Sequence, residues 1–499
     1  MTRRVAWIAA GIVFVVHAIA NPHYGFFRDE LYFIICGQHP QFGYVDQPPV
    51  VPLLAALTQI GGHSLFLLRL VPALCAGAGA FVTVLLVAEF GGGTFAQIFA
   101  VLVYAFTGVL GNFGMKVSPD EIGLWSWPLI AYFVVRITKG ADPRLWIAAG
   151  IVAGISLQSK YAVIFFLVAL LLGLLFTPQR SILFSRWFAL GGALAILIAL
   201  PNFIWQAQNG FPMWELLRNG QNGKNEIVGP LIYIVQEFEI TNIFLFPVWV
   251  IGFIWLLLRA PFRFLGYTYA ILILEMIVLH GKHYYPADVY PIVIAGGAAA
   301  IELWTARAAL WRIPIVAYAL LFGWWFIPFD LPILPESTFV AYRTEIGKIF
   351  SLGVSTETEH GREENLLTGD YADMHGWPEM AAAVQQIYNA LSPQDRTHAV
   401  VFGDNYGEAS AVKFFAPELP VISTHNQYWL WGPDGYDGSV LIQIGGTCWH
   451  KEGYFTSRTI ALTLASYYAI NYETNIPINI CRGLKYPVAE LWAKGKNYN

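Results

Sequence analysis

Two acidic elements near the start of the chain hold residue types that can transfer a proton. The first is Arg28-Asp29-Glu30, and the second is the Asp46-Gln47 pair that precedes two prolines. Adjacent carboxylates that follow an apolar segment carry a desolvation cost, and a carboxylate so placed can act as a general base towards a hydroxyl group. The alternative is a solvated helix start, at which Asp29 and Glu30 complement the helix dipole.

A further acidic position occurs in Ser118-Pro119-Asp120, at the beginning of a later apolar segment. The carboxylate of Asp120 can contact a donor molecule or a metal ion. The alternative is that Ser118 and Asp120 serve only to cap the helix that follows, which both residue types do well.

Basic residues interrupt two otherwise apolar segments. Lys160 lies in Gln-Ser-Lys-Tyr, and Lys282 is followed by His283 and two tyrosines. Cations at a membrane surface can hold a phosphate group. The alternative is that these side chains only extend from apolar helix ends towards water.

The four cysteines point to a disulfide and not to a metal site. Cys448 and Cys481 both fall in the polar C-terminal part, where an oxidising compartment permits a bond between them. The alternative is two unrelated buried thiols. Cys75 lies in an apolar segment and is expected to be an inert small hydrophobe. The Cys and His spacings match no zinc site, so the sequence predicts no metal ligands of this kind.

The elements that must position these residues are membrane helices. Hydrophobic residues make up 56% of the 499 and charged residues only 12%, about half the usual share. Long apolar runs recur up to position 329, and such runs cross membranes as helices because each satisfies its own backbone. We predict about eleven spans, over 5–21, 64–88, 94–113, 121–137, 145–158, 161–176, 187–205, 237–258, 265–280, 287–306 and 311–328.

The basic residues between these spans indicate the orientation of the chain. One set of short connections is basic, and it holds Arg3, Arg4, Arg136, Lys139, Arg144, Arg180, Arg186, Arg259, Arg263, Arg307 and Arg312. This side is therefore predicted to be cytoplasmic, together with the N-terminus. The run at 5–20 resembles a secretory signal, but we predict a first membrane helix, because the run is long and further spans follow.

Three segments are expected on the opposite side. The first loop, at about 22–63, contains apolar stretches at 31–36 and 50–60 that suit helices lying at the membrane surface. A second segment at 206–236 is rich in Asn, Gly and Gln and is expected to be a mobile loop.

The third segment is the C-terminal part, which we predict to be a soluble α/β domain over 331–499 after a membrane domain over 1–330. Short β-rich runs at 399–402, 420–423 and 439–444 alternate with helical stretches at 379–391, 408–415 and 457–470. Acidic residues outnumber basic ones in this part, which argues against nucleic-acid binding.

The order of these features resembles a known family. A basic N-terminus, a helix, the Asp29-Glu30 loop, the Asp46-Gln47 element, the Ser-Pro-Asp at 118–120 and Lys160 before a tyrosine resemble the protein O-mannosyltransferases. The likeness is closer to their bacterial branch, which includes the lipid A aminoarabinose transferases, and it covers roughly residues 1–310. The motifs at 403–408 and 428–432 are similar to the tails of uncharacterised bacterial relatives.

The resemblance implies a C-type glycosyltransferase fold and an inverting transfer from a sugar linked to a lipid monophosphate. It assigns Asp29 as the base and Asp120 as its active-site partner, and it matches Lys160 to a lysine of the family. The aminoarabinose transferases carry a phosphate-binding lysine before the proline pair, where this sequence has Gln47. A neutral amide donates a hydrogen bond but does not neutralise a phosphate, so donor binding is expected to differ here.

The sequence thus predicts an α-helical polytopic protein of the bacterial inner membrane that transfers a sugar from a polyprenyl-phosphate donor. The acceptor is a lipid, a polysaccharide or a protein on the outer side. Glu30 is the expected partner of Asp29, and Asp46 and Asp120 shape the cavity or hold a divalent cation. The expected phosphate contacts are Arg28, Gln47, Lys160, Lys282 and His283. No soluble cofactor is implied.

Two alternatives from other classes stay open. A transporter or lipid flippase also places charged residues in a membrane cavity, but transporters often show paired halves that this sequence lacks. A sugar-binding or assembly protein that keeps the fold without activity is the other alternative, because a fold alone proves no function.

Overall fold

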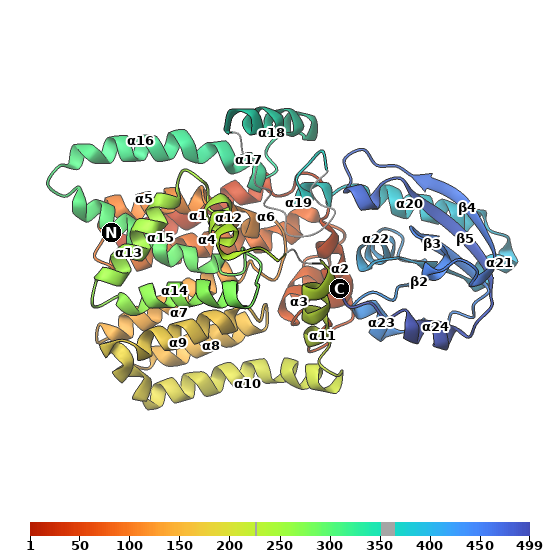
Figure 1. Cartoon of the computed structure of the whole chain (residues 1–499), viewed down its shortest axis with the longest axis horizontal. Helices are drawn as coiled ribbons and strands as arrows, with labels where there is room; N and C mark the ends of the chain where they lie inside the picture. The colour runs from red at the N-terminus through yellow and green to blue at the C-terminus, as the bar shows by residue number, and fades with distance from the viewer. Residues whose placement is uncertain (225–226, 351–364) are drawn as a thin grey trace. The chain divides into compact units, whose positions relative to one another are not determined.

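The computed structural model describes residues 1–224, 227–350 and 365–499 (Figure 1). The chain divides into two compact units, and each unit collects segments that are distant in sequence. The first unit comprises Met1–His23, Phe66–Trp205 and Ile227–Ile333. The second comprises Tyr24–Leu65, Gln206–Glu226 and Leu334–Asn499. The first acidic loop therefore belongs to the same unit as the C-terminal part of the chain.

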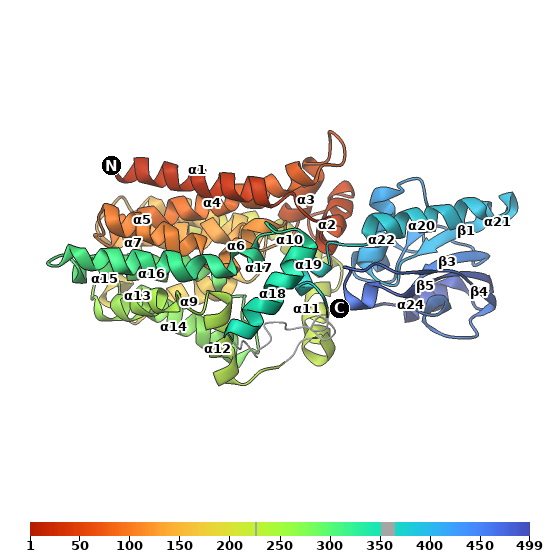
Figure 2. The ribbon, with the colours of Figure 1, turned by 90° about the horizontal axis from the view of Figure 1, so that it is seen from above.

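The first unit is built of helices that run alongside one another (Figure 2). Its α-helices are α1 (Thr2–Ala20), α4 (Leu65–Glu89), α5 (Thr94–Ala105), α6 (Gly108–Met115), α7 (Gly123–Thr138), α8 (Leu145–Leu157), α9 (Val163–Leu175), α10 (Arg186–Gln208), α12 (Pro230–Ile240), α13 (Phe246–Leu258), α14 (Arg263–Val278), α15 (Tyr290–Trp304), α16 (Arg312–Gly323) and α17 (Ile327–Asp330). Most residues of helix α15 are buried, whereas few residues of α10 and α16 are buried. An apolar exterior of this kind suits a lipid environment.

Several of these helices have the length and composition of membrane spans. Five helices in the described part of the chain are long and apolar enough to cross a membrane, and the number rises to seven if each of two bent pairs is one span. Each of the eleven ranges predicted as spans contains a helix. The range 94–113 is broken between α5 and α6 by a bend of 67°, and the range 237–258 is broken between α12 and α13.

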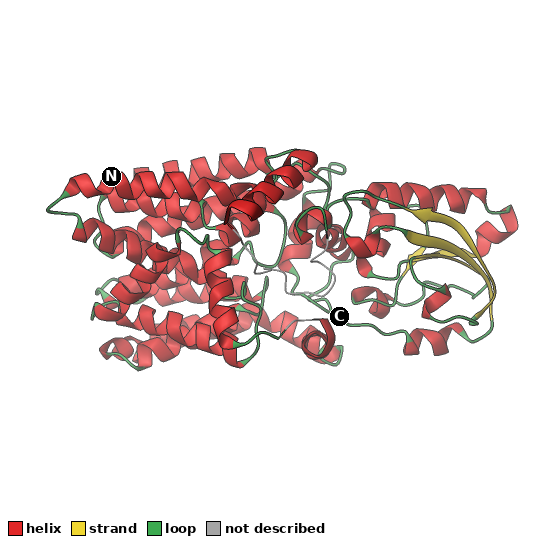
Figure 3. Ribbon diagram, turned by 45° about the horizontal axis from the view of Figure 1, so that its top comes forward, coloured by secondary structure: helices red, strands yellow, loops and turns green. Residues whose placement is uncertain are grey.

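The second unit combines short helices with a five-stranded sheet, and Figure 3 shows helices on both sides of this sheet. The strands are β1 (Ala399–Phe402), β2 (Val421–Ile422), β3 (Val440–Ile444), β4 (Phe455–Leu464) and β5 (Ile476–Leu484), in the spatial order β2-β1-β3-β5-β4. Strand β1 is parallel to β2 and β3, whereas β5 is antiparallel to β3 and β4. The helices are α2 (Arg28–Gln38), α3 (Val50–Leu57), α11 (Pro212–Asn219), α18 (Glu336–Phe350), α19 (Gly369–Ala372), α20 (Trp377–Ala390), α21 (Pro393–His398), α22 (Tyr406–Phe415), α23 (Gln427–Trp431) and α24 (Val488–Lys494).

Most of the predicted elements of this unit are present. Helices α2 and α3 occupy the apolar stretches of the first loop, and β1, β2 and β3 occupy the three predicted strand regions. One prediction is wrong. The region 457–470 is predicted to be helical but forms most of β4, whose threonines and Ile460 favour an extended chain paired with β5. The segment 206–236, predicted to be a mobile loop, contains α11 and the start of α12; its positions 225 and 226 lie outside the described residues.

A disulfide joins two elements of the sheet region. Cys448 follows β3 and Cys481 lies in β5, and their sulfur atoms are bonded with a Cα–Cα distance of 6.1 Å. The bond closes a loop with a sequence separation of 33. We expect non-reducing peptide mapping to recover the two cysteines in one linked peptide. We also expect the Cys448→Ala/Cys481→Ala double variant to lose about 3–4 kcal/mol of stability, by the chain-entropy argument. Recovery of both thiols in free form would contradict this pairing.

Candidate functional site

The Asp29 turn is held at the start of α2. The helix begins at Arg28, and the buried Glu30 carboxylate accepts a hydrogen bond of 2.9 Å from the backbone N–H of Phe27. Glu30 thus lies at a helix start, as the alternative interpretation expected, but it is buried and not solvated, and it satisfies a backbone donor that the helix itself leaves unpaired. The Asp29 side chain, by contrast, stays 33% exposed.

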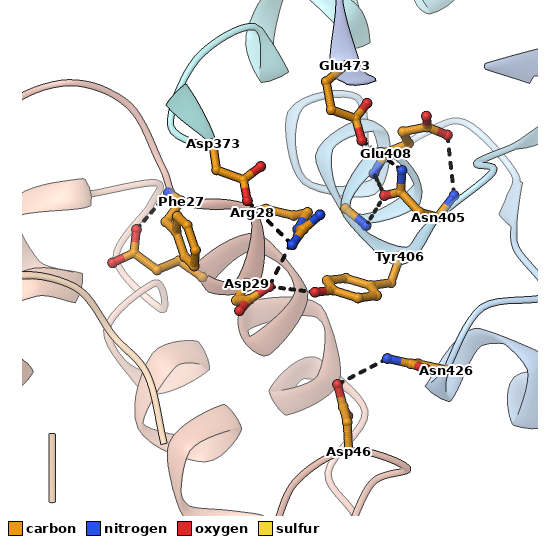
Figure 4. A network of polar contacts seen from close by, with 12 residues as sticks. Phe27, Arg28, Asp29, Asp46, Asp373, Asn405, Tyr406, Glu408, Asn426 and Glu473 are labelled. Carbon is orange, nitrogen blue, oxygen red and sulfur yellow. Dashed lines mark hydrogen bonds and ion pairs between the residues drawn. The ribbon is translucent and has the colours of Figure 1, made fainter. Parts of the chain in front are cut away.

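Asp29 is held through one of its two carboxylate oxygens (Figure 4). The Tyr406 hydroxyl donates a hydrogen bond of 2.7 Å to Oδ1, and the Arg28 Nε lies 3.7 Å from the same oxygen. Among the residues that the structure describes, no hydrogen-bond donor reaches Oδ2. The carboxylate is thus oriented on one side and open on the other, as a general base requires.

Arg28 is buried and engaged within the second unit. Its guanidinium lies 3.4 Å from the carboxylate of the fully buried Asp373 and donates a hydrogen bond of 2.7 Å to the Tyr472 hydroxyl. It also lies over the Tyr406 ring, 5.3 Å from its centroid. An arginine held from several sides is expected to order the Asp29 turn.

Asp46 lies in a loop that the C-terminal part of the unit supports. The Tyr32 hydroxyl donates a hydrogen bond of 3.0 Å to Asp46 Oδ1, and the Asn426 amide lies 3.4 Å from Oδ2. The neighbouring Val45 N–H donates to the side chain of Gln427 at 3.1 Å. Burial raises the pKa of Asp46 from 3.8 to about 7 against the lowering effect of the Tyr32 hydrogen bond, and the Asp29 charge adds to the rise.

The raised pKa of Asp46 predicts a pH dependence of stability. The folded protein keeps a proton on Asp46 that the unfolded chain has lost, so stability falls as pH rises from about 4 to about 7 and stays level above. The Asp46→Asn variant lacks this component. Thermal unfolding should therefore be measured at about pH 5 and about pH 8. The unfolding midpoint of the variant, relative to that of the wild type, should be higher at about pH 8 than at about pH 5. A difference in midpoint that does not change with pH would contradict the assignment.

Gln47 has a buried amide without a protein partner. The residue is 1% exposed, and neither Nε2 nor Oε1 has a hydrogen-bond partner among the described residues. Buried polar groups are normally satisfied, so an unpaired amide indicates a missing partner such as a water molecule or a ligand. The contact of Gln47 with a donor stays a prediction.

The first unit contains its own polar cluster, formed by Asp120, Lys160, Lys282, His283 and the tyrosines beside them. Lys160 pairs with Asp120, which lies in the turn before α7. The Lys160 ammonium also lies 4.7 Å from the Tyr285 ring centroid and 5.2 Å from that of Tyr284. Ser118 supports the turn by accepting a hydrogen bond of 3.2 Å from the Asp120 N–H. The helix itself starts at Gly123, so the prediction that Ser118 and Asp120 cap it is wrong.

Lys282 and His283 belong to the same cluster. The Lys282 ammonium lies 5.9 Å from the Tyr284 ring centroid, so that ring is shared between Lys282 and Lys160. His283 is 5% exposed, and burial lowers its pKa to about 4, with the Lys282 charge acting in the same direction. His283 is therefore neutral at neutral pH. It can donate a hydrogen bond to a phosphate but cannot neutralise it.

The predicted polar site residues thus divide between the two units. Arg28, Asp29, Glu30, Asp46 and Gln47 lie in the second unit, and Asp120, Lys160, Lys282 and His283 lie in the first. Sequence reasoning missed Asp288, which lies against Gly123 in the first unit and interacts with Asp120 and Lys160. It also missed Tyr406 and Asn426. Tyr406 lies in the motif at 403–408, to which the sequence assigns no function. In the described part of the chain, no three His, Cys, Asp or Glu side chains are placed to hold a metal ion.

Comparisons with known proteins show what this chain is similar to. Residues 46–205 match the model of a family described as dolichyl-phosphate-mannose-protein mannosyltransferase. A lipid A galacturonosyltransferase, RgtD from Rhizobium johnstonii, is 28% identical over 188 residues, and the match spans 37% of this chain and 39% of that protein.

Solved structures with the same fold cover nearly the whole chain. ArnT from Cupriavidus metallidurans bound to undecaprenyl phosphate has a TM-score of 0.58 at 14% identity, and 95% of this chain and 97% of that chain are covered. The apo state of the same protein gives a TM-score of 0.59 at 13% identity, with the same coverage. The resemblance predicted from the sequence is confirmed: residues 46–205 are similar to that mannosyltransferase family, and the chain has the C-type glycosyltransferase fold of ArnT.

Proposed function

We propose that this protein is an inverting glycosyltransferase that moves one sugar from a polyprenyl-phosphate donor to an acceptor hydroxyl. The observation that carries the proposal is the geometry of Asp29, whose Oδ1 is held by Tyr406 and whose carboxylate stays accessible. The similarity of residues 46–205 to a family described as dolichyl-phosphate-mannose-protein mannosyltransferase supports a transfer from a lipid-phosphate sugar.

The proposed reaction is a single displacement. The acceptor oxygen attacks the anomeric carbon, the bond from that carbon to the phosphate oxygen breaks, and polyprenyl monophosphate leaves with its negative charge. Asp29 takes the proton of the attacking hydroxyl, and Glu30 keeps the Asp29 turn in place through its bond to Phe27. No metal ion or soluble cofactor is needed to balance the reaction, and a divalent cation near Asp46 or Asp120 is an optional addition.

Positive charge for the donor phosphate is assigned to Lys160 and Lys282. Neutral His283 of the first unit and Gln47 of the second unit are separate candidates for hydrogen bonds to a donor, because each has a buried side-chain nitrogen without a partner among the described residues. The polyprenyl carrier is supported by the ArnT structure, whose fold this chain shares and which binds undecaprenyl phosphate. Arg28, a predicted phosphate contact, is assigned instead to the support of the Asp29 turn, because it is held by Asp373 and Tyr472.

The proposed setting is the bacterial inner membrane, with about eleven spans over residues 1–330 and with the N-terminus in the cytoplasm. The α/β region over 331–499 and the first loop at 22–63 are placed on the outer side, where a polyprenyl-linked sugar would be transferred. A lipid acceptor is favoured, because the relative RgtD is named for a transfer to lipid A. A polysaccharide or a protein acceptor is the alternative.

The two lysines should matter for donor binding more than for the chemical step. Met keeps the length and apolar stem of Lys but removes the charge, so Lys160→Met and Lys282→Met should each raise the KM for the lipid donor about tenfold and change kcat less. Steady-state kinetics in detergent or liposomes measures both constants.

Lys139→Met is the matched control for these variants. Lys139 also pairs with a carboxylate, that of Glu89, but it follows the C-terminal end of α7, whereas Asp120 precedes the N-terminal end of that helix. Its substitution should leave KM unchanged. An unchanged KM in both the Lys160 and the Lys282 variants would remove these residues from the donor site.

The function is tested by mass spectrometry of lipids and surface glycans from a strain that lacks the gene. We expect one glycoconjugate to lose a sugar and one polyprenyl-phosphate sugar to accumulate. A strain with unchanged glycoconjugates and unchanged lipid-linked sugars would refute the transferase. A changed transmembrane distribution of a lipid, without loss of any sugar, would favour a flippase instead.

A further inference from the structure

The start of α22 packs against the start of α2, and both lie in the second unit. Asn405 fixes the first turn of α22, because its side-chain oxygen accepts hydrogen bonds from the N–H groups of Gly407 at 2.8 Å and Glu408 at 3.1 Å. The Asn405 amide in turn donates to the Glu473 carboxylate at 2.8 Å. This turn is therefore rigidly held within the C-terminal part of the unit (Figure 4).

The same turn is shaped to receive Arg28. A methyl group at Gly407 would overlap the Cγ and Cδ atoms of Arg28, so the close approach of the two helix starts depends on glycine at this position. The Tyr406 ring lies under the Arg28 guanidinium, 5.3 Å from its centroid, and 4.7 Å from the ring of Tyr32. Packing against Arg28 and Tyr32 therefore fixes the Tyr406 ring independently of the hydrogen bond that its hydroxyl makes.

The Tyr406 hydroxyl is directed at the Asp29 carboxylate. Burial raises the pKa of Tyr406 well above its ordinary value, and the charge of Asp29 acts in the same direction while that of Arg28 opposes it. The phenol therefore stays protonated and acts as the donor in the 2.7 Å hydrogen bond to Oδ1. This bond restricts the rotation of a carboxylate that is otherwise partly exposed.

We propose that the Asn405–Gly407 turn of the C-terminal part belongs to the transferase site, and that Tyr406 is a positioning residue for Asp29. Its hydroxyl holds Oδ1 so that Oδ2 is presented to the acceptor hydroxyl in one orientation. The inference rests on the proposed function, because it takes Asp29 to be the group that accepts the proton. It gives the C-terminal part a role in the reaction itself, in addition to any role in folding or acceptor capture.

The test is the Tyr406→Phe variant, which keeps the packed ring and removes only the hydroxyl. The donor is the polyprenyl-phosphate sugar extracted from the deletion strain, and the acceptor fraction comes from the same strain. We expect kcat to fall about tenfold through lost orientation, with the donor KM and the Kd for undecaprenyl phosphate within about twofold of the wild type. Tyr388→Phe is the matched control, because Tyr388 in α20 donates to the backbone oxygen of Arg396 at 3.1 Å. The control should turn over at the wild-type rate.

A double-mutant cycle with Asp29→Asn decides whether Tyr406 acts through Asp29. We expect Tyr406→Phe to cost little more once Asp29 is already Asn, because the base it positions is gone. An equal loss in both backgrounds would overturn the inference, as would wild-type kcat in Tyr406→Phe beside a slow Asp29→Asn, and both results would leave the proposed function standing. Wild-type turnover in Asp29→Asn would overturn the proposed function and the inference with it.

Discussion

The Asp29→Asn variant is expected to lower kcat by at least about 10², because a general base contributes about 10²- to 10⁴-fold to such a transfer. Asparagine keeps the shape of the side chain and can still accept the Tyr406 hydrogen bond, but it cannot take the proton of an acceptor hydroxyl. The donor KM should change only a few-fold, since the step that is lost follows binding. Steady-state kinetics on protein purified at equal yield measures both effects.

Asp395→Asn is the matched control for this variant. Asp395 also lies in the first turn of a helix, beside an arginine, with a side chain 29% exposed compared with 33% for Asp29. The control should keep wild-type turnover. Glu30→Gln should cost less than Asp29→Asn, because glutamine can still accept the hydrogen bond from Phe27. If Asp29→Asn stayed active while Asp46→Asn or Asp120→Asn was inactive, the role of base would pass to that residue.

The Arg28→Met variant is expected to have the largest effect on stability, about 3–5 kcal/mol, which is typical of breaking a buried ion pair. Arg28 is 7% exposed, and its partner Asp373 is fully buried, so the variant leaves a carboxylate in the interior without its nearest positive charge. Thermal unfolding and limited proteolysis of the purified protein should show the loss. The Arg28→Met/Asp373→Met double variant should recover part of it, because the buried Asp373 carboxylate is then no longer left without Arg28.

Arg482→Met provides the comparison. Arg482 pairs with Asp395 at 2.9 Å, but the two side chains are 40% and 29% exposed, and pairs of this kind contribute about 0–1 kcal/mol. If Arg28→Met were no less stable than Arg482→Met, the buried pair would not be what holds the Asp29 turn.

The helical part of the fold could be read from the sequence because its signal is local. A long apolar run needs no partner to be recognised, and each predicted span range contains a helix in the structure. The same logic found α2, α3 and three of the five strands. It failed at 457–470, where a stretch with several apolar residues suits a helix or a strand equally well. The pairing of β4 with β5 decided the outcome there, and pairing is not a local property.

The candidate site was predictable in its acidic residues but not in what holds them. Asp29 and Asp46 stand out because carboxylates next to apolar segments need an explanation. Their partners Tyr406 and Asn426 lie 377 and 380 residues further along the chain, and no spacing rule connects such positions. The burial that raises the pKa of Asp46 likewise arises from the folded second unit and not from its sequence neighbours.

The most direct test of the central claim is the product analysis of the purified protein in liposomes, supplied with the polyprenyl-phosphate sugar from the deletion strain. We expect one polyprenyl monophosphate to be released for each sugar transferred, an inverted anomeric configuration in the product, and release slowed at least about 10²-fold by Asp29→Asn. Retention of configuration, or equal rates for the wild type and Asp29→Asn, would contradict the account.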